Sequence, residues 1–190
     1  MSKILVDTID TRSGTSNITI GSSNASQITL KSGATLTNFP NNTPSFYGEL
    51  ASAQVVSRAT VTKITGMTQN EIDTNTAFDG TTFTVPSGQA GKYYIFCSVF
   101  GNFSDSGNDG SKIQLEIYKN GSSVREATYS ANTNNLIIAE QKSVSAILDL
   151  SVGDTIEMYV LLSDDSAGSG MKAGGGGQAT HLGGYKIIGA

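Results

Sequence analysis

Few residues of this 190-residue chain carry the functional groups that catalysis or metal binding needs. His181 is the only histidine and Cys97 the only cysteine. A Ser-His-Asp triad or a multi-histidine metal site would depend on that single imidazole, which stands beside the strand-like stretch HLGGYKI. We therefore expect His181 to be structural or to lie at a subunit interface, and we expect the chain not to be an enzyme.

Aspartates gather in two stretches rich in Gly and Ser, GNFSDSGNDGS and SDDSAGSG. Asp105, Asp109, Asp164 and Asp165 could ligate a hard cation such as calcium through oxygen. The adjacent Asp164 and Asp165 would point in different directions, unlike the facing carboxylates of a glycosidase. We expect solvated loop carboxylates here, with no catalytic residue and no cofactor. Calcium at Asp164 and Asp165 is the alternative.

The remaining chemistry of the chain excludes several classes of partner. Cys97 lies in the apolar run YYIFCSVF, which predicts a small buried core residue, and a lone cysteine forms no disulfide within the chain. Net charge is −4 with only 12 Lys and Arg, so nucleic acid is not an expected partner. The opening MSKILVDTID has too short an apolar run for a signal peptide or an anchor, so we expect no membrane insertion.

The elements that must position these residues are short strands. Many stretches alternate between apolar and polar residues, and Gly-, Ser- and Asn-rich turns separate them, which favours an antiparallel sandwich or barrel. The expected strands are residues 54–64, 81–86, 92–100, 112–121, 126–131, 142–150, 154–162 and 183–189. The Asn120-Gly121 pair predicts a type I′ hairpin. Only residues 48–56 could be interpreted as a turn of helix.

Residues 1–45 differ from the rest of the chain. They contain apolar triplets such as ITI and ITL between Gly and Ser, and no aromatic residue before Phe39. Such a ribbon is marginal alone, so its apolar face must meet another surface. We therefore divide the chain into an attachment segment, residues 1–45, and a head domain, residues 46–190. The candidate residues for this attachment are Ile4, Val6, Ile9, Ile18, Ile20, Ile28, Leu30 and Leu36.

Four stretches of the head domain, in order, resemble the trimeric jelly rolls of the globular heads of complement subcomponent q, which are related to tumour necrosis factor. They are AFDGTTFTVPSGQAGKYYIF, LEIYKNGSSV, VSAILDLSVGDTIEMYV and HLGGYKI. The matching residues of the first stretch are Phe78, Asp79, Gly80, Phe83, Pro86, Gly91, Tyr93 and Phe96. The resemblance implies an all-β, antiparallel jelly-roll sandwich that forms homotrimers and binds partners without catalysis.

Several matched residues also have a physical interpretation of their own. Gly91 and Gly153 lie where the chain turns into a strand, positions that often need a positive φ. The residues expected to face inward are Tyr93, Phe96, Leu148, Leu150, Ile156, Met158 and Val160.

The opening MSKILVDTIDTRSGTSNITIGSS resembles the start of small structural proteins of marine tailed bacteriophages. That resemblance implies a virion protein that is made in the bacterial host cytoplasm. We favour a capsid decoration or cement protein, with other virion proteins as partners and a head that could bind a host-surface glycan or protein. The alternatives are a tail fibre or fibre tip and a bacterial extracellular lectin-like module.

Overall fold

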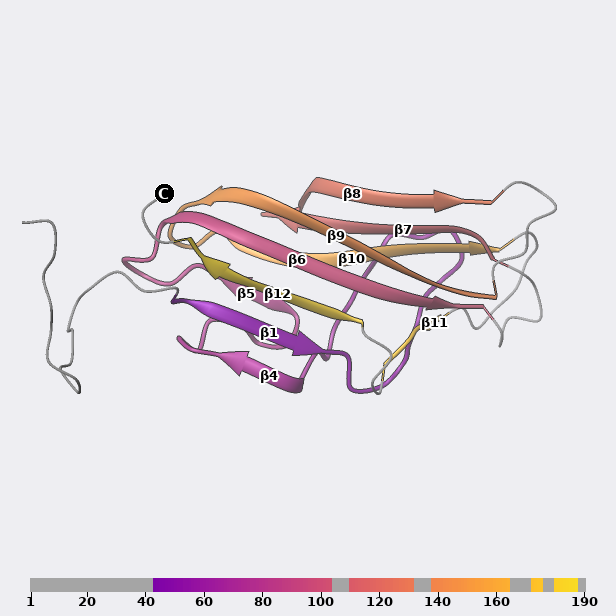
Figure 1. Cartoon of the computed structure of the whole chain (residues 1–190), viewed down its shortest axis with the longest axis horizontal. Coiled ribbons are helices and arrows are strands. Elements are labelled where there is room, and N and C mark those ends of the chain that lie inside the picture. Colours follow the sequence, from indigo (N-terminus) through magenta and orange to yellow (C-terminus); the bar gives the residue numbers. More distant parts are fainter. Residues whose placement is uncertain (1–42, 104–109, 132–137, 165–171, 176–179, 188–190) are drawn as a thin grey trace, which may run out of the picture. The chain divides into compact units, whose positions relative to one another are not determined.

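The computed structural model describes residues 43–103, 110–131, 138–164, 172–175 and 180–187. Within these ranges the chain forms strands joined by turns, with no helix, and every strand pair is antiparallel. The strands make two sheets of seven and five strands (Figure 1). The expectation of an all-β, antiparallel jelly roll is confirmed. None of the described residues belongs to a helix that is long and apolar enough to cross a membrane.

The larger sheet has the order β2-β11-β6-β12-β1-β4, with β9 on the other side of β6. Its strands are β1 (Ser45–Glu49), β2 (Gln54–Val55), β4 (Gln69–Asp73), β6 (Gly91–Asn102), β9 (Ala139–Leu150), β11 (Lys172–Ala173) and β12 (His181–Lys186). The smaller sheet has the order β3-β10-β7-β8, and β5 also pairs with β10. Its strands are β3 (Thr62–Lys63), β5 (Thr82–Thr84), β7 (Gly110–Lys119), β8 (Ser122–Ser130) and β10 (Thr155–Asp164).

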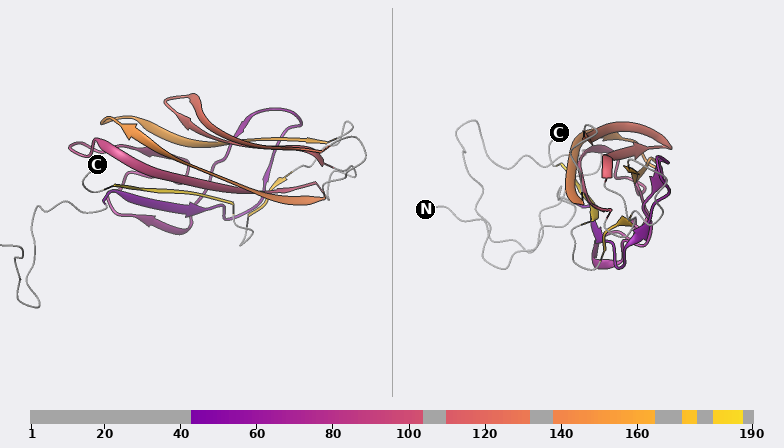
Figure 2. Two further views of the ribbon diagram at one scale, coloured as in Figure 1. Left: turned by 45° about the horizontal axis from the view of Figure 1, so that its top comes forward. Right: turned by 90° about the vertical axis from the view of Figure 1, so that its right-hand side faces the viewer.

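Figure 2 shows the two curved sheets facing each other, and the buried side chains of the core lie between them. Alternate residues of each long strand fill it, because successive side chains of a strand point to opposite faces. The most deeply buried side chains of β6, β7 and β10 are Tyr93, Ile95, Val99, Ile113, Leu115, Ile117, Ile156, Met158, Val160 and Leu162. Phe46 of β1 stacks on Phe83 of β5 with ring centroids 4.1 Å apart, which joins the two sheets at one point.

Turn predictions hold where the backbone chemistry is specific. Asn120 and Gly121 both adopt positive φ, 51° and 77°, between β7 and β8. Gly91, the first residue of β6, and Gly153, in the turn that precedes β10, also have positive φ, 147° and 85°. These four residues confirm the hairpin and the two expected glycine turns.

Two expectations are wrong, one about a strand and one about an inward-facing residue, and the alternative of a helical turn at residues 48–56 is not realised. Residues 54–64 are not one strand, because a turn closed by the Thr60 amide and the Ser57 carbonyl separates β2 from β3, which belong to different sheets. Residues 48–56 contain no helical turn, since they comprise the end of β1, two bends and β2. Phe96 does not face the core but lies on the opposite face of β6, because inward residues of that strand have odd numbers.

The attachment segment, including the eight residues from Ile4 to Leu36, falls within residues 1–42 and lies outside the described residues. The division near residue 45 therefore stays a prediction. The first described strand, β1, begins at Ser45.

Candidate interaction surface

The outer face of the larger sheet carries a group of aromatic side chains. Tyr47 of β1, Tyr94 and Phe96 of β6, and His181 and Tyr185 of β12 share this face; we call these five residues the aromatic face. The strands bring them together through register, because Tyr47 pairs with Gly183 and Gly183 with Phe96, while Tyr185 pairs with Tyr94. Residues from distant parts of the chain thus form one surface.

The rings of the aromatic face contact one another. The Tyr94 ring lies 5.8 Å from Phe96 and 5.7 Å from Tyr185, between ring centroids. His181 lies 5.3 Å from Tyr47 and 5.9 Å from Phe96, the second contact being edge-on. Aromatic pairs in tilted or edge-on geometry at these separations are favourable, so the rings form a cluster on the sheet.

Two glycines in the middle of β12 let rings pack on both sides of the strand. A Cβ atom on Gly183 would lie 2.7 Å from Phe96 Cζ and 3.0 Å from Tyr47 Cδ2, on the aromatic face. A Cβ atom on Gly184 would lie 2.7 Å from Ile95 Cδ1 and 3.0 Å from Phe46 Cε1, in the core. Both contacts are shorter than real Cβ atoms show, so a side chain at either position would displace its neighbours.

Exposed aliphatic side chains extend the aromatic face on both sides. Ile147 of β9, opposite Tyr94, is 65% exposed, and Ile72 of β4, opposite Tyr47, is 53% exposed. Tyr185 is itself 38% exposed. A depression of about 230 Å³ lies beside these rings, lined by residues of β6, β9 and β12 that include His181 and Ser145. A continuous apolar area of this kind on a solvent-facing sheet indicates a surface for contact with another molecule.

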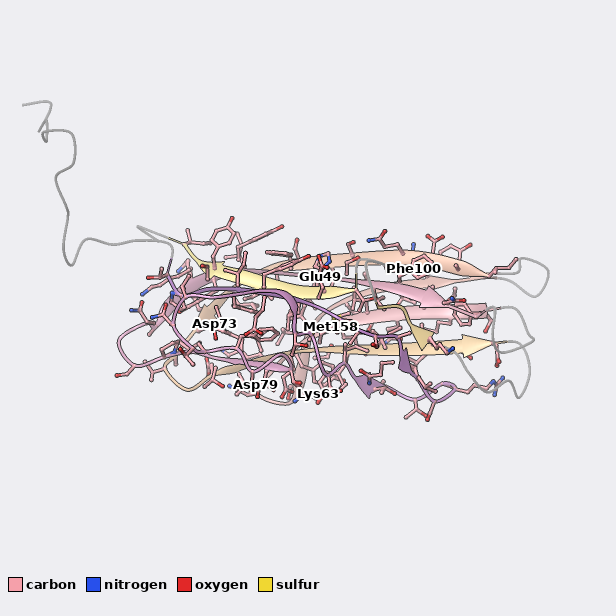
Figure 3. The ribbon with its side chains drawn as sticks, turned by 90° about the horizontal axis from the view of Figure 1, so that it is seen from below. Glu49, Lys63, Asp73, Asp79, Phe100 and Met158 are labelled. Carbon is pink, nitrogen blue, oxygen red and sulfur yellow. The ribbon has the colours of Figure 1, made fainter. Side chains whose placement is uncertain are left out.

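One polar group of this surface, the Tyr47 hydroxyl, is hydrogen-bonded to a neighbouring carboxylate. The Tyr47 hydroxyl donates to Glu49 Oε1 at 2.6 Å, and burial, together with Glu49, raises the pKa of Tyr47 to about 12. Tyr47 is therefore a neutral donor at physiological pH. Glu49, labelled in Figure 3, pairs with His181 in the β1–β12 ladder, which places a carboxylate on the same row as the imidazole.

The structure places the predicted site residues as follows. His181 begins β12 and takes part in the aromatic face, which fits the expected structural or interface role. Cys97 is buried, and burial raises the pKa of its thiol well above the usual range, so it is the expected inert core residue. Asp105, Asp109 and Asp165 lie outside the described residues.

Asp164 does not lie in a solvated loop. It is the last residue of β10, and its side chain is fully buried. Its Oδ1 accepts a hydrogen bond from Arg58 Nε at 2.5 Å, and the Arg58 guanidinium also donates to the Asp164 carbonyl. The expectation that Asp164 is a solvated loop carboxylate is wrong. Its partner Arg58 lies 106 residues away, and nothing in the sequence indicates that the two side chains pair. Among the described residues, no three His, Cys, Asp or Glu side chains are placed to hold a metal ion.

The aromatic face is the feature that the sequence reasoning missed. The sequence signal for this surface is the run KYYIF in β6. Tyr93 and Ile95 point into the core, while Tyr94 and Phe96, which alternate with them, place aromatic rings on the outer face of the strand. A strand that is apolar on both faces needs a second layer on its outer side.

Comparison with known proteins supports the fold. The chain is similar to the solved structure described as "Globular Domain of Zebrafish Complement 1qA protein", with a TM-score of 0.51 and 15% sequence identity over 76% of this chain and 98% of that chain. It is also similar to "Structure of Eiger TNF from S. frugiperda", with a TM-score of 0.48 and 12% identity over 77% of this chain and 92% of that chain. No family model and no curated protein matches the chain. The first of these similarities shows that the described domain shares the fold of the complement globular domain, in agreement with its antiparallel jelly-roll sheets.

Proposed function

We propose that the protein is a homotrimeric binding module that decorates the surface of a tailed-bacteriophage virion. The observation that supports the trimer is the aromatic face, which presents Tyr94, Phe96 and Tyr185 with the exposed Ile147 beside them. A second and a third copy of the domain would cover these side chains. Burying them would contribute roughly 25 cal/mol for each Å² of apolar surface removed from water.

The virion assignment is supported by the amino-terminal sequence. MSKILVDTIDTRSGTSNITIGSS resembles the start of phage structural proteins, and the apolar triplets of residues 1–45 need a partner surface. In this proposal the segment attaches the trimer to the capsid, the head projects from it, and no catalytic step is involved.

Mass measurement in solution tests the trimer. The full-length protein at micromolar concentration should have the mass of three chains. Ile147→Asp should reduce that mass to one chain, since a buried unpaired carboxylate is costly and Ile147 is exposed in the single domain. Val124→Asp on β8 is the matched control, because Val124 is exposed but lies on the other sheet. A monomeric wild-type protein would contradict the proposal.

Imaging of virions that carry labelled protein tests the location. Label on the capsid, in tens to hundreds of copies, is expected for a decoration protein. A small multiple of three at the tail would instead identify a fibre or fibre tip, and an unlabelled virion would contradict both virion roles.

A further inference from the structure

A cleft of about 480 Å³ lies beside the loop between β4 and β5, apart from the aromatic face. It is lined by residues 75–79 and by four residues in and after β5, Thr82, Thr84, Val85 and Pro86. Small-molecule sites usually measure roughly 300–1,000 Å³, so the cleft has a suitable size.

The wall of the cleft is held in place by two aspartates, both labelled in Figure 3. The Asp73 carboxylate accepts hydrogen bonds from the amides of Asn75, Ala77 and Phe78 at 3.0–3.2 Å. Asp79 Oδ1 accepts from the amides of Thr81 and Thr82 at 2.9 and 2.7 Å. Side chains that bind their own loop in this way fix its backbone, so a ligand would find the wall already formed.

The floor of the cleft is apolar and belongs to the core. Phe78 is 5% exposed and its ring lies 5.3 Å from Phe46, while Val85 is 2% exposed. Pro86 completes this surface. Phe78 and Val85 therefore present only the edges of their side chains to the cleft, and the half-buried Pro86 is the most accessible apolar residue of the floor.

Polar groups of the cleft are available to a ligand. Thr76, Thr84 and Asp79 are exposed, and no described residue hydrogen-bonds to the two hydroxyls or to Asp79 Oδ2. These groups accept hydrogen bonds, and the hydroxyls also donate. Among the described lining residues Asp79 carries the only charge. An anionic ligand would meet that carboxylate with no cation to balance it, and a hard cation normally takes six to eight oxygen ligands.

We propose that this cleft binds an uncharged sugar ring, as part of a surface polysaccharide. A sugar combines an apolar C–H face for Phe78, Val85 and Pro86 with hydroxyls that donate to Asp79 and exchange hydrogen bonds with Thr76 and Thr84. The proposal deepens the binding role proposed above by naming its site and ligand class. It does not depend on the trimer, which a mass measurement tests separately.

Titration of the isotope-labelled full-length protein tests the cleft. The probes are methyl glycosides of the common hexoses and N-acetylhexosamines, at millimolar concentration, followed by amide NMR shifts. At least one glycoside should shift the amide signals of residues 75–85 in a saturable way, with inorganic phosphate and calcium chloride producing no such shifts there. Failure of every glycoside, or a response to phosphate or calcium instead, would overturn the proposal even if the protein is trimeric.

Three variants complete the test. Thr84→Val removes a hydroxyl with no internal partner, and Asp79→Asn keeps the Oδ1 acceptor for the loop while replacing Oδ2 by a donor. Each should weaken glycoside binding about tenfold, the effect of one lost hydrogen bond to a ligand, with the spectrum elsewhere unchanged. Thr65→Val, at an exposed threonine outside the cleft, should bind as the wild type does. Equal affinity in all three variants would refute the site.

Discussion

Asp154 lies in the turn between β9 and β10, where the fold stabilises its charged form. Its oxygens accept hydrogen bonds from Asn120 Nδ2 at 2.8 Å and from the Ser151 amide at 2.8 Å, and Lys119 Nζ lies 2.9 Å away. Led by the Asn120 hydrogen bond, these contacts lower the pKa of Asp154 to about 2. The Gly153-Asp154 pair thus has a structural role here.

The lowered pKa of Asp154 predicts an acid-dependent loss of stability. Because the folded pKa lies below the unfolded value of 3.8, this contribution is present above pH 4 and is lost as the pH falls towards 2. Asn120→Gly should raise the pKa of Asp154 and so reduce the change in stability with pH. Glycine keeps the positive φ of 51° but lacks the side-chain amide that donates to Asp154. Thermal unfolding between pH 2 and 5 measures the change in stability with pH. The same change in the variant as in the wild type would contradict the assigned role of Asn120.

The Arg58–Asp164 pair predicts a second effect at the scale of the residue. Arg58→Met leaves the fully buried Asp164 carboxylate without its cation, so we expect a loss of about 1–3 kcal/mol in the free energy of unfolding. The double variant Arg58→Met, Asp164→Leu removes both charges and should recover most of that loss. Urea unfolding measures both proteins, and equal stability of wild type and Arg58→Met would show that the pair contributes nothing.

The strand β12 contains two neighbouring glycines whose substitution should affect different properties, one the stability of the domain and the other its self-association. Gly184→Ala places a methyl group against Ile95, the Tyr94 carbonyl and Phe46, so we expect a loss of about 1–3 kcal/mol in the free energy of unfolding. Gly183→Ala meets the Phe96 and Tyr47 rings on the outer face, which can move towards solvent. It should therefore weaken self-association more than stability. Urea unfolding and mass measurement distinguish the two, and identical behaviour of both variants would contradict the assignment of faces.

The sequence predicts the long strands of this domain because their alternation and turn chemistry are local. β10 and the hairpin at Asn120-Gly121 are examples, since each is specified by residues next to one another. β4 is missed because QNEID has one apolar residue, Ile72, and exists as a strand only by pairing with β1. The ion pair of Asp164 is missed for the same reason, because its partner Arg58 is distant in the sequence.

The proposed sites require different amounts of tertiary information. The sequence shows that KYYIF has aromatic residues on both faces of a strand. The convergence of Tyr47, Phe96 and His181, however, depends on the register between β1, β12 and β6. The cleft is even harder to predict from the sequence. Its Phe78-Asp79 pair matches a family pattern, whereas the hydrogen bonds from Asp73 that shape the wall follow no motif.

At the scale of the whole molecule, attachment and binding are assigned to different parts of the chain. The head domain supplies the core, the aromatic face and the cleft, and residues 1–45 supply apolar triplets that the proposal directs to the virion. This separation predicts that a change in one part leaves the other part's role intact.

Serine substitution of the apolar triplets tests that separation. Ile18→Ser, Ile20→Ser, Ile28→Ser and Leu30→Ser together remove the apolar face of residues 17–30, so the protein should fail to join virions when supplied to an infection that lacks the native copy. The purified variant should keep the near-ultraviolet circular dichroism of the head, because Tyr93, Phe46 and Phe83 pack within the described domain. Val152→Ser, an exposed change in the β9–β10 turn, is the control and should be incorporated normally. Normal incorporation of the four-residue variant would instead place the attachment on the head domain, and the aromatic face would then be its first candidate.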